Sequence, residues 1–115
     1  MKRGEVWTVS GGASYTGKPR PAVIVQDDHF AGTDSITLCV FTTDPTDAPL
    51  IRLLIDPSIE NGLRSPSRLM IDKITTVPKA RVGTRLGRLA DEDIVRLNRA
   101  LVVFLGLAAA PARRA

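Results

Sequence analysis

Apolar residues in the first two thirds of the chain come in short segments, separated by glycine, proline and aspartate. Residues 22–25 form a continuous apolar run, which is typical of a strand covered on both faces. Asp-Pro pairs at 44–45 and 56–57 end two further segments. Short strands at this spacing favour a small barrel or sandwich, so we expect a mainly β fold. The strands expected from the pattern are 5–9, 22–25, 36–42, 50–55 and 69–76.

The pattern changes to a helical period near the C-terminus. Between residues 94 and 105 apolar side chains recur at helical spacing, with arginines off that face. The acidic run at 91–93 offers a capping candidate and suits the positive end of a helix dipole. We expect this helix to pack across the barrel and to end near Gly106. The predicted organisation is one domain over residues 1–107, followed by a flexible tail over 108–115.

Composition excludes several classes of protein. No apolar run approaches the ~20 residues that a membrane helix needs, and the charged N-terminus leads into a strand-like pattern without the long apolar stretch of a signal peptide. Cys39 is the single cysteine, which rules out an internal disulfide or a cysteine-rich metal site. These features predict a cytoplasmic protein without a membrane partner.

Charge is distributed unevenly along the chain, whose net charge is +4. Residues 27–60 hold seven acidic side chains against Arg52 alone, whereas residues 61–90 hold seven basic side chains against Asp72 alone. The basic stretch could face a polyanion, of which nucleic acid is the commonest. Alternatively, both stretches are ordinary solvated faces.

Lys18-Pro19-Arg20-Pro21 is the sharpest local feature. Proline fixes its own φ and pushes the preceding residue towards extended geometry, so Arg20 is held stiffly where a loop joins a strand. A guanidinium placed in this way can grip a phosphate through two hydrogen bonds and stabilise charge that develops on it. The alternative is a strand-edge arginine whose prolines block edge pairing.

Two further pairs carry polar groups at the ends of apolar runs. Thr42 and Thr43 end a strand, where a hydroxyl could bond a phosphate oxygen or simply cap the next turn. Asp72 and Lys73 interrupt the apolar run that begins at residue 69. Because strand side chains alternate, one of this pair could point inward and need a partner. Asp72 is therefore a candidate for orienting an arginine or an interface, with a structural role favoured.

Other candidates are weaker. His29, the only histidine, lies beside Asp27 and Asp28, but a short turn lacks the separated, convergent ligands of a closed metal site, and we expect a solvated turn. The loop over 10–19 has no hydrophobic period, so Tyr15 within it could stack on bases. We predict neither a metal nor a cofactor.

In this order, these features resemble the PemK/MazF family of toxin endoribonucleases, in its mycobacterial-like branch. The matching pieces run from residue 3 to about 106 and no single one is decisive, but the ordered series is specific. They are Arg3-Gly4-Glu5-Val6-Trp7, Arg20-Pro21-Ala22-Val23-Ile24-Val25, Thr42-Thr43, Leu69-Met70-Ile71-Asp72-Lys73-Ile74, Lys79-Ala80-Arg81 with Gly83, and Leu86-Gly87.

The resemblance implies an SH3-like barrel with a C-terminal α-helix, paired as a homodimer so that single-stranded RNA crosses both subunits. It implies cleavage that leaves a 2′,3′-cyclic phosphate and a 5′-hydroxyl, and a cognate antitoxin that covers the groove. The family's catalytic arginine and threonine fall on Arg20 and Thr42. Some members have a Glu or His in the first loop, and the matching stretch at 13–16 has neither. The residues we expect to bind RNA are Tyr15, Lys18, Thr43, Asp72, Lys73 and Arg81.

Two other functions fit the same barrel. One is a non-catalytic toxin that binds a protein target such as gyrase; those relatives rely on residues of the C-terminal helix rather than on an Arg-Pro loop. The other is an RNA-binding barrel without turnover. Arg20 and Thr42 favour the endoribonuclease over both.

Overall fold

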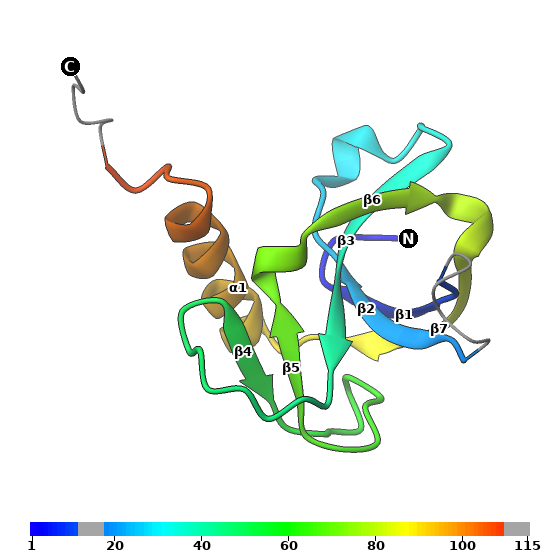
Figure 1. Cartoon of the computed structure of the whole chain (residues 1–115). Helices are drawn as coiled ribbons and strands as arrows, with labels where there is room; N and C mark the ends of the chain where they lie inside the picture. Colours follow the sequence, from blue (N-terminus) through cyan, green and yellow to red (C-terminus); the bar gives the residue numbers. More distant parts are fainter. Residues whose placement is uncertain (12–17, 110–115) are drawn as a thin grey trace.

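The protein is described by a computed structural model, which covers residues 1–11 and 18–109 (Figure 1). Its sheet has the strand order β4-β5-β3-β2-β1-β7, with β6 also paired to β3. The sheet curls into an open barrel with α1 at its side, which confirms a mainly β barrel with a C-terminal helix. The strands are β1 (Glu5–Val9), β2 (Arg20–Ile24), β3 (Ser35–Thr42), β4 (Arg52–Ile55), β5 (Ser67–Met70), β6 (Thr75–Pro78) and β7 (Val82–Arg88). The helices are the 3-10 turns η1 (Asp28–Phe30), η2 (Ile71–Lys73) and η3 (Lys79–Arg81), and the α-helix α1 (Asp91–Phe104).

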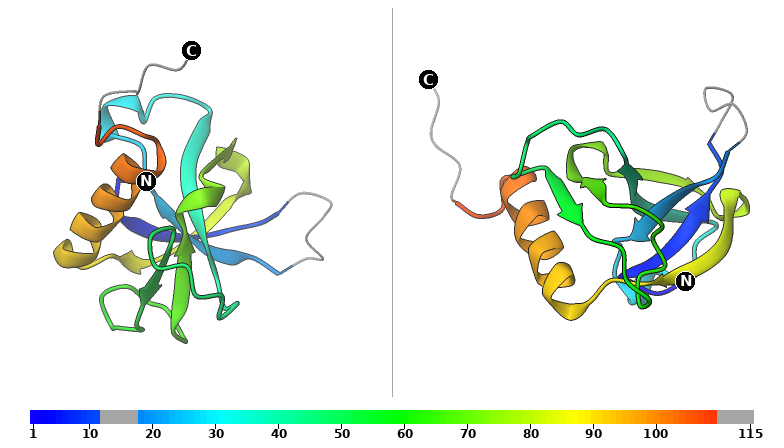
Figure 2. Two further views of the ribbon diagram at one scale, coloured as in Figure 1. Left: turned by 60° about the vertical axis from the view of Figure 1, so that its left-hand side comes forward. Right: turned by 90° about the horizontal axis from the view of Figure 1, so that it is seen from below.

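Each face of the sheet packs into its own apolar cluster, as alternating side chains require. The main core lies under α1, which rests against the β4 side of the curled sheet (Figure 2). The second core lies on the opposite face, where Trp7 is half-buried against it. The main core comprises Val6, Val23, Val25, Cys39, Phe41, Leu53, Ile55, Leu63, Leu69, Ile71, Leu89, Leu97 and Ala100; the second comprises Val9, Ala22, Ile24, Ile36 and Leu38.

The helix begins at residue 91 as predicted. Its N-cap is Ala90, whose methyl side chain cannot accept a hydrogen bond from the first turn. The acids at 91–93 therefore act through their charge at the N-terminal turn rather than as a cap. At the other end Gly106 takes φ +74°, and the amides of Gly106 and Leu107 bond back to the carbonyls of Val103 and Val102. No helix within the described residues is long and apolar enough to cross a membrane.

The single strand expected over 69–76 is wrong. The chain leaves β5 at Met70, turns through η2, and resumes as β6, and both strands pair with the same edge of β3. Ile71 is buried within the turn, so the apolar pattern continues across the break and hides it. The turn lets two short strands follow one long curved partner.

An ion pair fixes η2 to β4. Arg52 Nε donates to Asp72 Oδ1 at 2.8 Å, and Arg52 Nη2 donates to Asp72 Oδ2 at 3.0 Å. These bonds hold the pKa of the Asp72 carboxyl below its usual range and raise the pKa of Arg52. Both side chains are largely shielded from solvent. The arginine that Asp72 was expected to orient is therefore Arg52, in the structural role that the sequence favoured.

We expect Asp72→Asn to lower the free energy of unfolding by about 1–3 kcal/mol at neutral pH, because a charge-assisted pair is lost. Since the pKa of Asp72 is lowered on folding, its contribution is complete above the ordinary carboxyl pKa of about 3.9 and disappears as the pH falls through the lowered value. Urea unfolding at pH 7 and near pH 2–3 should therefore show a difference that shrinks in acid. Asp47→Asn, at an exposed position, is the matched control. Equal stability of both variants at pH 7 would contradict the assignment.

β7 was not expected from the sequence, because most of its side chains are exposed and no apolar alternation marks it. It pairs with β1, and its backbone lies directly against the backbone of the loop between β4 and β5. A Cβ on Gly87 would lie 2.2 Å from the Glu60 carbonyl oxygen, and one on Gly62 would lie 2.2 Å from the Leu86 oxygen. Glycine at 62 and 87 therefore lets the two backbones touch.

Gly87→Ala should cost about 1–3 kcal/mol of stability, as overpacking does when the neighbour is backbone. The control is Gly32→Ala, because nothing lies within 4 Å of a Cβ at that position. The comparison is made by urea denaturation. If Gly87→Ala matched the control, the close approach would not be the constraint described.

Candidate functional site

Arg20 begins β2 and Thr42 ends β3, so both lie towards the same end of two antiparallel strands. In the β2–β3 pairing Ala22 faces Val40 and Ile24 faces Leu38. Two residues beyond the Ala22–Val40 pair, the strands reach Arg20 and Thr42 respectively. On the other side of β3, Thr42 faces Arg68 of β5.

These three side chains belong to one face of the sheet. Thr42 shares the parity of Val40, and Arg20 that of Ala22, so both project away from the main core. Arg68 alternates with Leu69, which is fully buried in the main core. Arg20 is exposed, while Thr42 and Arg68 are half-buried. We call Arg20, Thr42 and Arg68 the cross-strand row.

The turn after β3 sets the hydrogen bonding of Thr42. The Asp44 amide donates to Thr42 Oγ1 at 3.1 Å, and the Asp44 carboxylate accepts from the amide and hydroxyl of Thr46 at 3.0 and 2.8 Å. The bonds from Thr46, with the nearby charges of Arg52 and Arg68, lower the pKa of Asp44. Oγ1 of Thr42 accepts this bond, and its hydroxyl can still donate its proton to another acceptor.

A shallow hollow of about 330 Å³ is lined by Val40, Met70, Lys73, Ile74 and Thr75. The cross-strand row does not line it, but Val40 is two residues from Thr42 on β3 and Met70 is two residues from Arg68 on β5. Lys73 borders the hollow from η2 and is exposed. The ion pair of Arg52 and Asp72 therefore anchors the turn that presents Lys73.

The remaining predicted RNA-binding residues that the structure describes lie beside the ends of β2, β3 and η3. Lys18 is exposed two residues before β2, and Thr43 is exposed directly after β3. Arg81 ends η3, and its carbonyl oxygen accepts from the Ser10 amide at 2.9 Å. It precedes Val82, which pairs with β1 on the side away from β2. Tyr15 lies outside the described residues.

Other reactive side chains contribute little here. Cys39 is completely buried, and burial raises the pKa of its thiol to about 12. His29 is held by Asp27, whose carboxylate bonds the His29 ring Nδ1 at 2.7 Å and its amide at 2.8 Å. Within residues 1–11 and 18–109, no three histidine, cysteine or acidic side chains gather where they could hold a metal ion.

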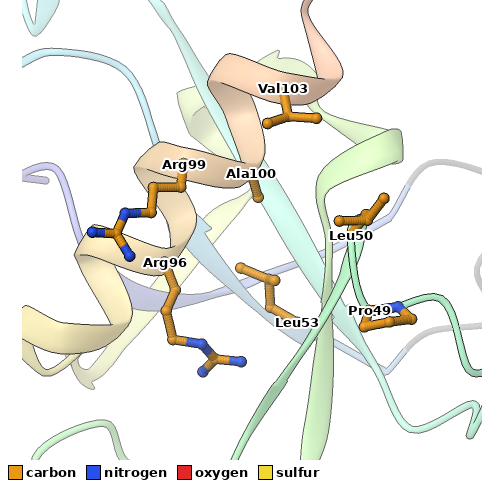
Figure 3. A pocket seen from close by; sticks show the side chains of 7 residues that line it. All are labelled: Pro49, Leu50, Leu53, Arg96, Arg99, Ala100 and Val103. Atoms are coloured by element: carbon orange, nitrogen blue, oxygen red, sulfur yellow. The ribbon is translucent and has the colours of Figure 1, made fainter. Parts of the chain in front are cut away.

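A second hollow, of about 260 Å³, lies between α1 and the segment before β4 (Figure 3). Its floor is apolar, and Arg96 and Arg99 of α1 stand at its rim. Arg96 donates to the Leu54 carbonyl oxygen at 3.0 Å and to Asp93 Oδ1 at 2.9 Å. None of the side chains predicted for the site lines this hollow.

Sequence reasoning missed Arg68 and Arg52 as parts of the site. Both occupy alternate positions of strands whose other face is buried, so the sequence does indicate that they face away from the core. Only the register shows which residues they meet: Thr42 for Arg68 and η2 for Arg52.

Comparisons with known proteins agree with this architecture. A protein of Mycolicibacterium smegmatis named "Probable endoribonuclease MazF" is 54% identical over 108 residues, covering 94% of this chain and 99% of that protein. An "Endoribonuclease in complex with its cognate antitoxin from Mycobacterial species" has a TM-score of 0.79 at 24% identity, over 96% of this chain and 99% of the other. The "Mycobacterium tuberculosis toxin MazF-mt6" has a TM-score of 0.75 at 19% identity, over 89% and 96%.

A family model described as "PemK-like, MazF-like toxin of type II toxin-antitoxin system" matches residues 2–105. This match and the 54% identical relative together span almost all of the sequence. The family that the ordered motifs predicted is confirmed: the chain belongs to the PemK-like, MazF-like toxins of type II toxin–antitoxin systems.

Proposed function

We propose that this chain is a toxin endoribonuclease that cuts single-stranded RNA at short sequence motifs. Its relative named as an endoribonuclease supports the activity, and its family supports the role of a toxin. The observation that carries the proposal is that Arg20 and Thr42 belong to one face of the sheet and lie towards the same end of β2 and β3. A positive charge and a hydroxyl donor on one face are what a phosphate requires.

The reaction uses the substrate's own 2′-hydroxyl. Its oxygen loses a proton and bonds to the adjacent phosphorus, the bond from phosphorus to the 5′-oxygen breaks, and the departing oxygen takes up a proton. The products carry a 2′,3′-cyclic phosphate and a 5′-hydroxyl. The reaction consumes no cofactor and no outside nucleophile. The protein's task is therefore to hold the 2′-oxygen in line with the bond that breaks and to stabilise the developing charge.

Arg20 and Thr42 divide that task. The guanidinium of Arg20, fixed between two prolines, grips the phosphate and stabilises the charge of the pentacoordinate state. It does not act as a base, because a guanidinium keeps its proton in proteins. Thr42 donates its hydroxyl proton to a phosphate oxygen, since Oγ1 already accepts from Asp44.

The surrounding residues hold the RNA on either side of the scissile bond. Lys18 and Arg81 attract phosphates near the first loop, and Lys73 does so at the hollow. Asp72 contributes by fixing η2 through Arg52 rather than by meeting the negatively charged strand. Thr43 adds a hydroxyl beside the cross-strand row, and Tyr15 offers a ring on which a base can stack.

We expect the toxin to act in the cytoplasm as a symmetric homodimer that a cognate antitoxin neutralises. One solved relative is described with its cognate antitoxin, and another as "MazE-MazF (Form-II) from Deinococcus radiodurans". Two barrels of this size paired as a dimer offer a longer surface for RNA than one barrel does. Exposed apolar side chains of Leu50, Val103 and Leu107, two of them at the hollow of Figure 3, leave surface for such contacts.

Cleavage should persist in excess EDTA, because the balanced reaction needs cationic side chains rather than a divalent ion. The measurement is incubation of the pure protein with a long RNA, followed by mapping of the fragment ends, which should carry 5′-hydroxyl and cyclic phosphate groups. An unrelated metal-dependent nuclease, inhibited by the same EDTA, is the control. Activity that returns only with added metal would contradict the mechanism. Intact RNA under all conditions would instead favour the non-catalytic toxin.

Arg20→Ala should lower the single-turnover rate at saturating enzyme on the order of 10²-fold or more, the effect of losing one preorganised charge-stabilising donor. Lys18→Ala removes the same charge two residues away, and it should mainly raise the enzyme concentration needed for saturation. Arg20→Lys should restore only part of the rate, because an ammonium lacks the two-pronged contact. Thr42→Ala should also slow the saturated step.

Circular dichroism checks that each variant is folded. A folded Arg20→Ala protein that cuts at the wild-type rate would overturn the catalytic assignment. If Arg20→Ala and Lys18→Ala weakened RNA binding equally and left the saturated rate unchanged, both residues would serve only to attract RNA.

A further inference from the structure

The strands on both sides of β3 carry an arginine on the face of Thr42. Thr42 pairs with Arg68 of β5, and on the other side Arg20 lies two residues beyond the Ala22–Val40 pair of β2 and β3. Directly opposed side chains on adjacent antiparallel strands, such as Thr42 and Arg68, have Cβ atoms roughly 4.5–5.5 Å apart. Arg68 is therefore within reach of a ligand at the Thr42 hydroxyl, and Arg20 lies on the same face.

Arg68 differs from Arg52, which lies on the same face of the next strand. Arg52 is held by both oxygens of Asp72. In the described part of the chain no acidic group lies within ion-pair distance of Arg68, and its charge reaches Asp44 only as a minor influence on that group's pKa. The carboxylate of Asp44 is already bonded by Thr46. Among the described residues, Arg68 is thus a half-buried cation whose guanidinium has no ion-pair partner.

The two neighbours of Arg68 limit where its side chain can go. It lies between Thr42 on β3 and Leu54 on β4, and Leu54 is 43% exposed. An aliphatic arginine stem packs against such an apolar neighbour while the charged head remains in water. The donors of Arg68 then lie at the solvent side of the cross-strand row, where a bound phosphate can reach them.

We propose that Arg68 is a second phosphate-binding residue, which holds the non-bridging oxygen that Arg20 leaves uncovered. This inference rests on the proposed function. The scissile phosphate carries one negative charge before attack and gains a second in the pentacoordinate state, shared by its two non-bridging oxygens. Arginines on the two strands that flank β3, with the Thr42 hydroxyl on the same face, suit that distribution. The bound charge is greatest in the pentacoordinate state, so Arg68 should affect the rate more than the affinity.

The first test compares Arg68→Ala with Arg64→Ala, which removes the same charge from an exposed position outside the strands. Single-turnover cleavage is measured on a short RNA that contains a cut site mapped with the wild-type protein. We expect the saturated rate to fall on the order of 10²-fold for Arg68→Ala and by no more than about twofold for Arg64→Ala. Arg68→Lys, which keeps charge and bulk, should lie between them. A folded Arg68→Ala protein at the wild-type rate would overturn the inference.

The second test separates contact from a structural role. The same RNA is made with sulfur in place of one or the other non-bridging oxygen at the scissile phosphate, and both isomers are cut by each protein. Sulfur is a poor hydrogen-bond acceptor, so one isomer should weaken the contact with Arg68. That isomer should be cut more slowly by the wild type and by Arg64→Ala. In Arg68→Ala the contact is already lost, so the same isomer should cause no further decrease in rate. The other isomer should lose its effect in Arg20→Ala.

The outcomes distinguish this inference from the proposed function. Unchanged sulfur effects in Arg68→Ala and Arg68→Lys would show that Arg68 only supports the strand, while wild-type cleavage and the loss in Arg20→Ala would leave the endoribonuclease in place. No cleavage by the wild-type protein would instead reject the proposed function itself.

Discussion

Pairing along both edges of β3 is the constraint on which the rest of the structure depends. Backbone groups in a covered strand need partners, and β3 finds them in β2 on one edge and in β6 and β5 in turn on the other. Because two strands share that second edge, the chain must turn between them, and the turn is η2. The same pairing places Thr42 between two strands that each carry an arginine. The candidate site is therefore a consequence of how β3 is covered.

Elements with an apolar face against a core could be predicted from the sequence. The strand over 5–9 and the start of the helix at 91 agree with the structure, because their periodicity reflects burial. Two features could not be predicted in this way. β7 is exposed along most of its length, and η2 interrupts a run in which Ile71 stays buried. In both places the conformation is decided by a neighbouring strand rather than by local pattern.

The residues of the candidate site likewise fall into those with a local sequence signal and those without one. Arg20 and Thr42 have local signals, namely flanking prolines and a strand end, and the structure places them on one face, towards the same end of β2 and β3. Arg68 has no such signal, since an arginine alternating with apolar residues marks only an outward face. Asp72 was expected to need a cationic partner, and that partner, Arg52, lies 20 residues earlier in the chain. Identifying such partners requires the register.

The exposed end strand has a consequence for behaviour at high concentration. β7 is the last strand in the sheet order, and an open edge is where a second molecule can add its own strand. Its surface bears Arg85, which pairs with Glu5 at 3.0 Å, and the amide of Arg88 is already bonded to Glu60 at 2.8 Å. Charge and prior hydrogen bonding oppose edge-to-edge growth. The composition that makes β7 hard to recognise in the sequence therefore also protects the protein against cross-β aggregation.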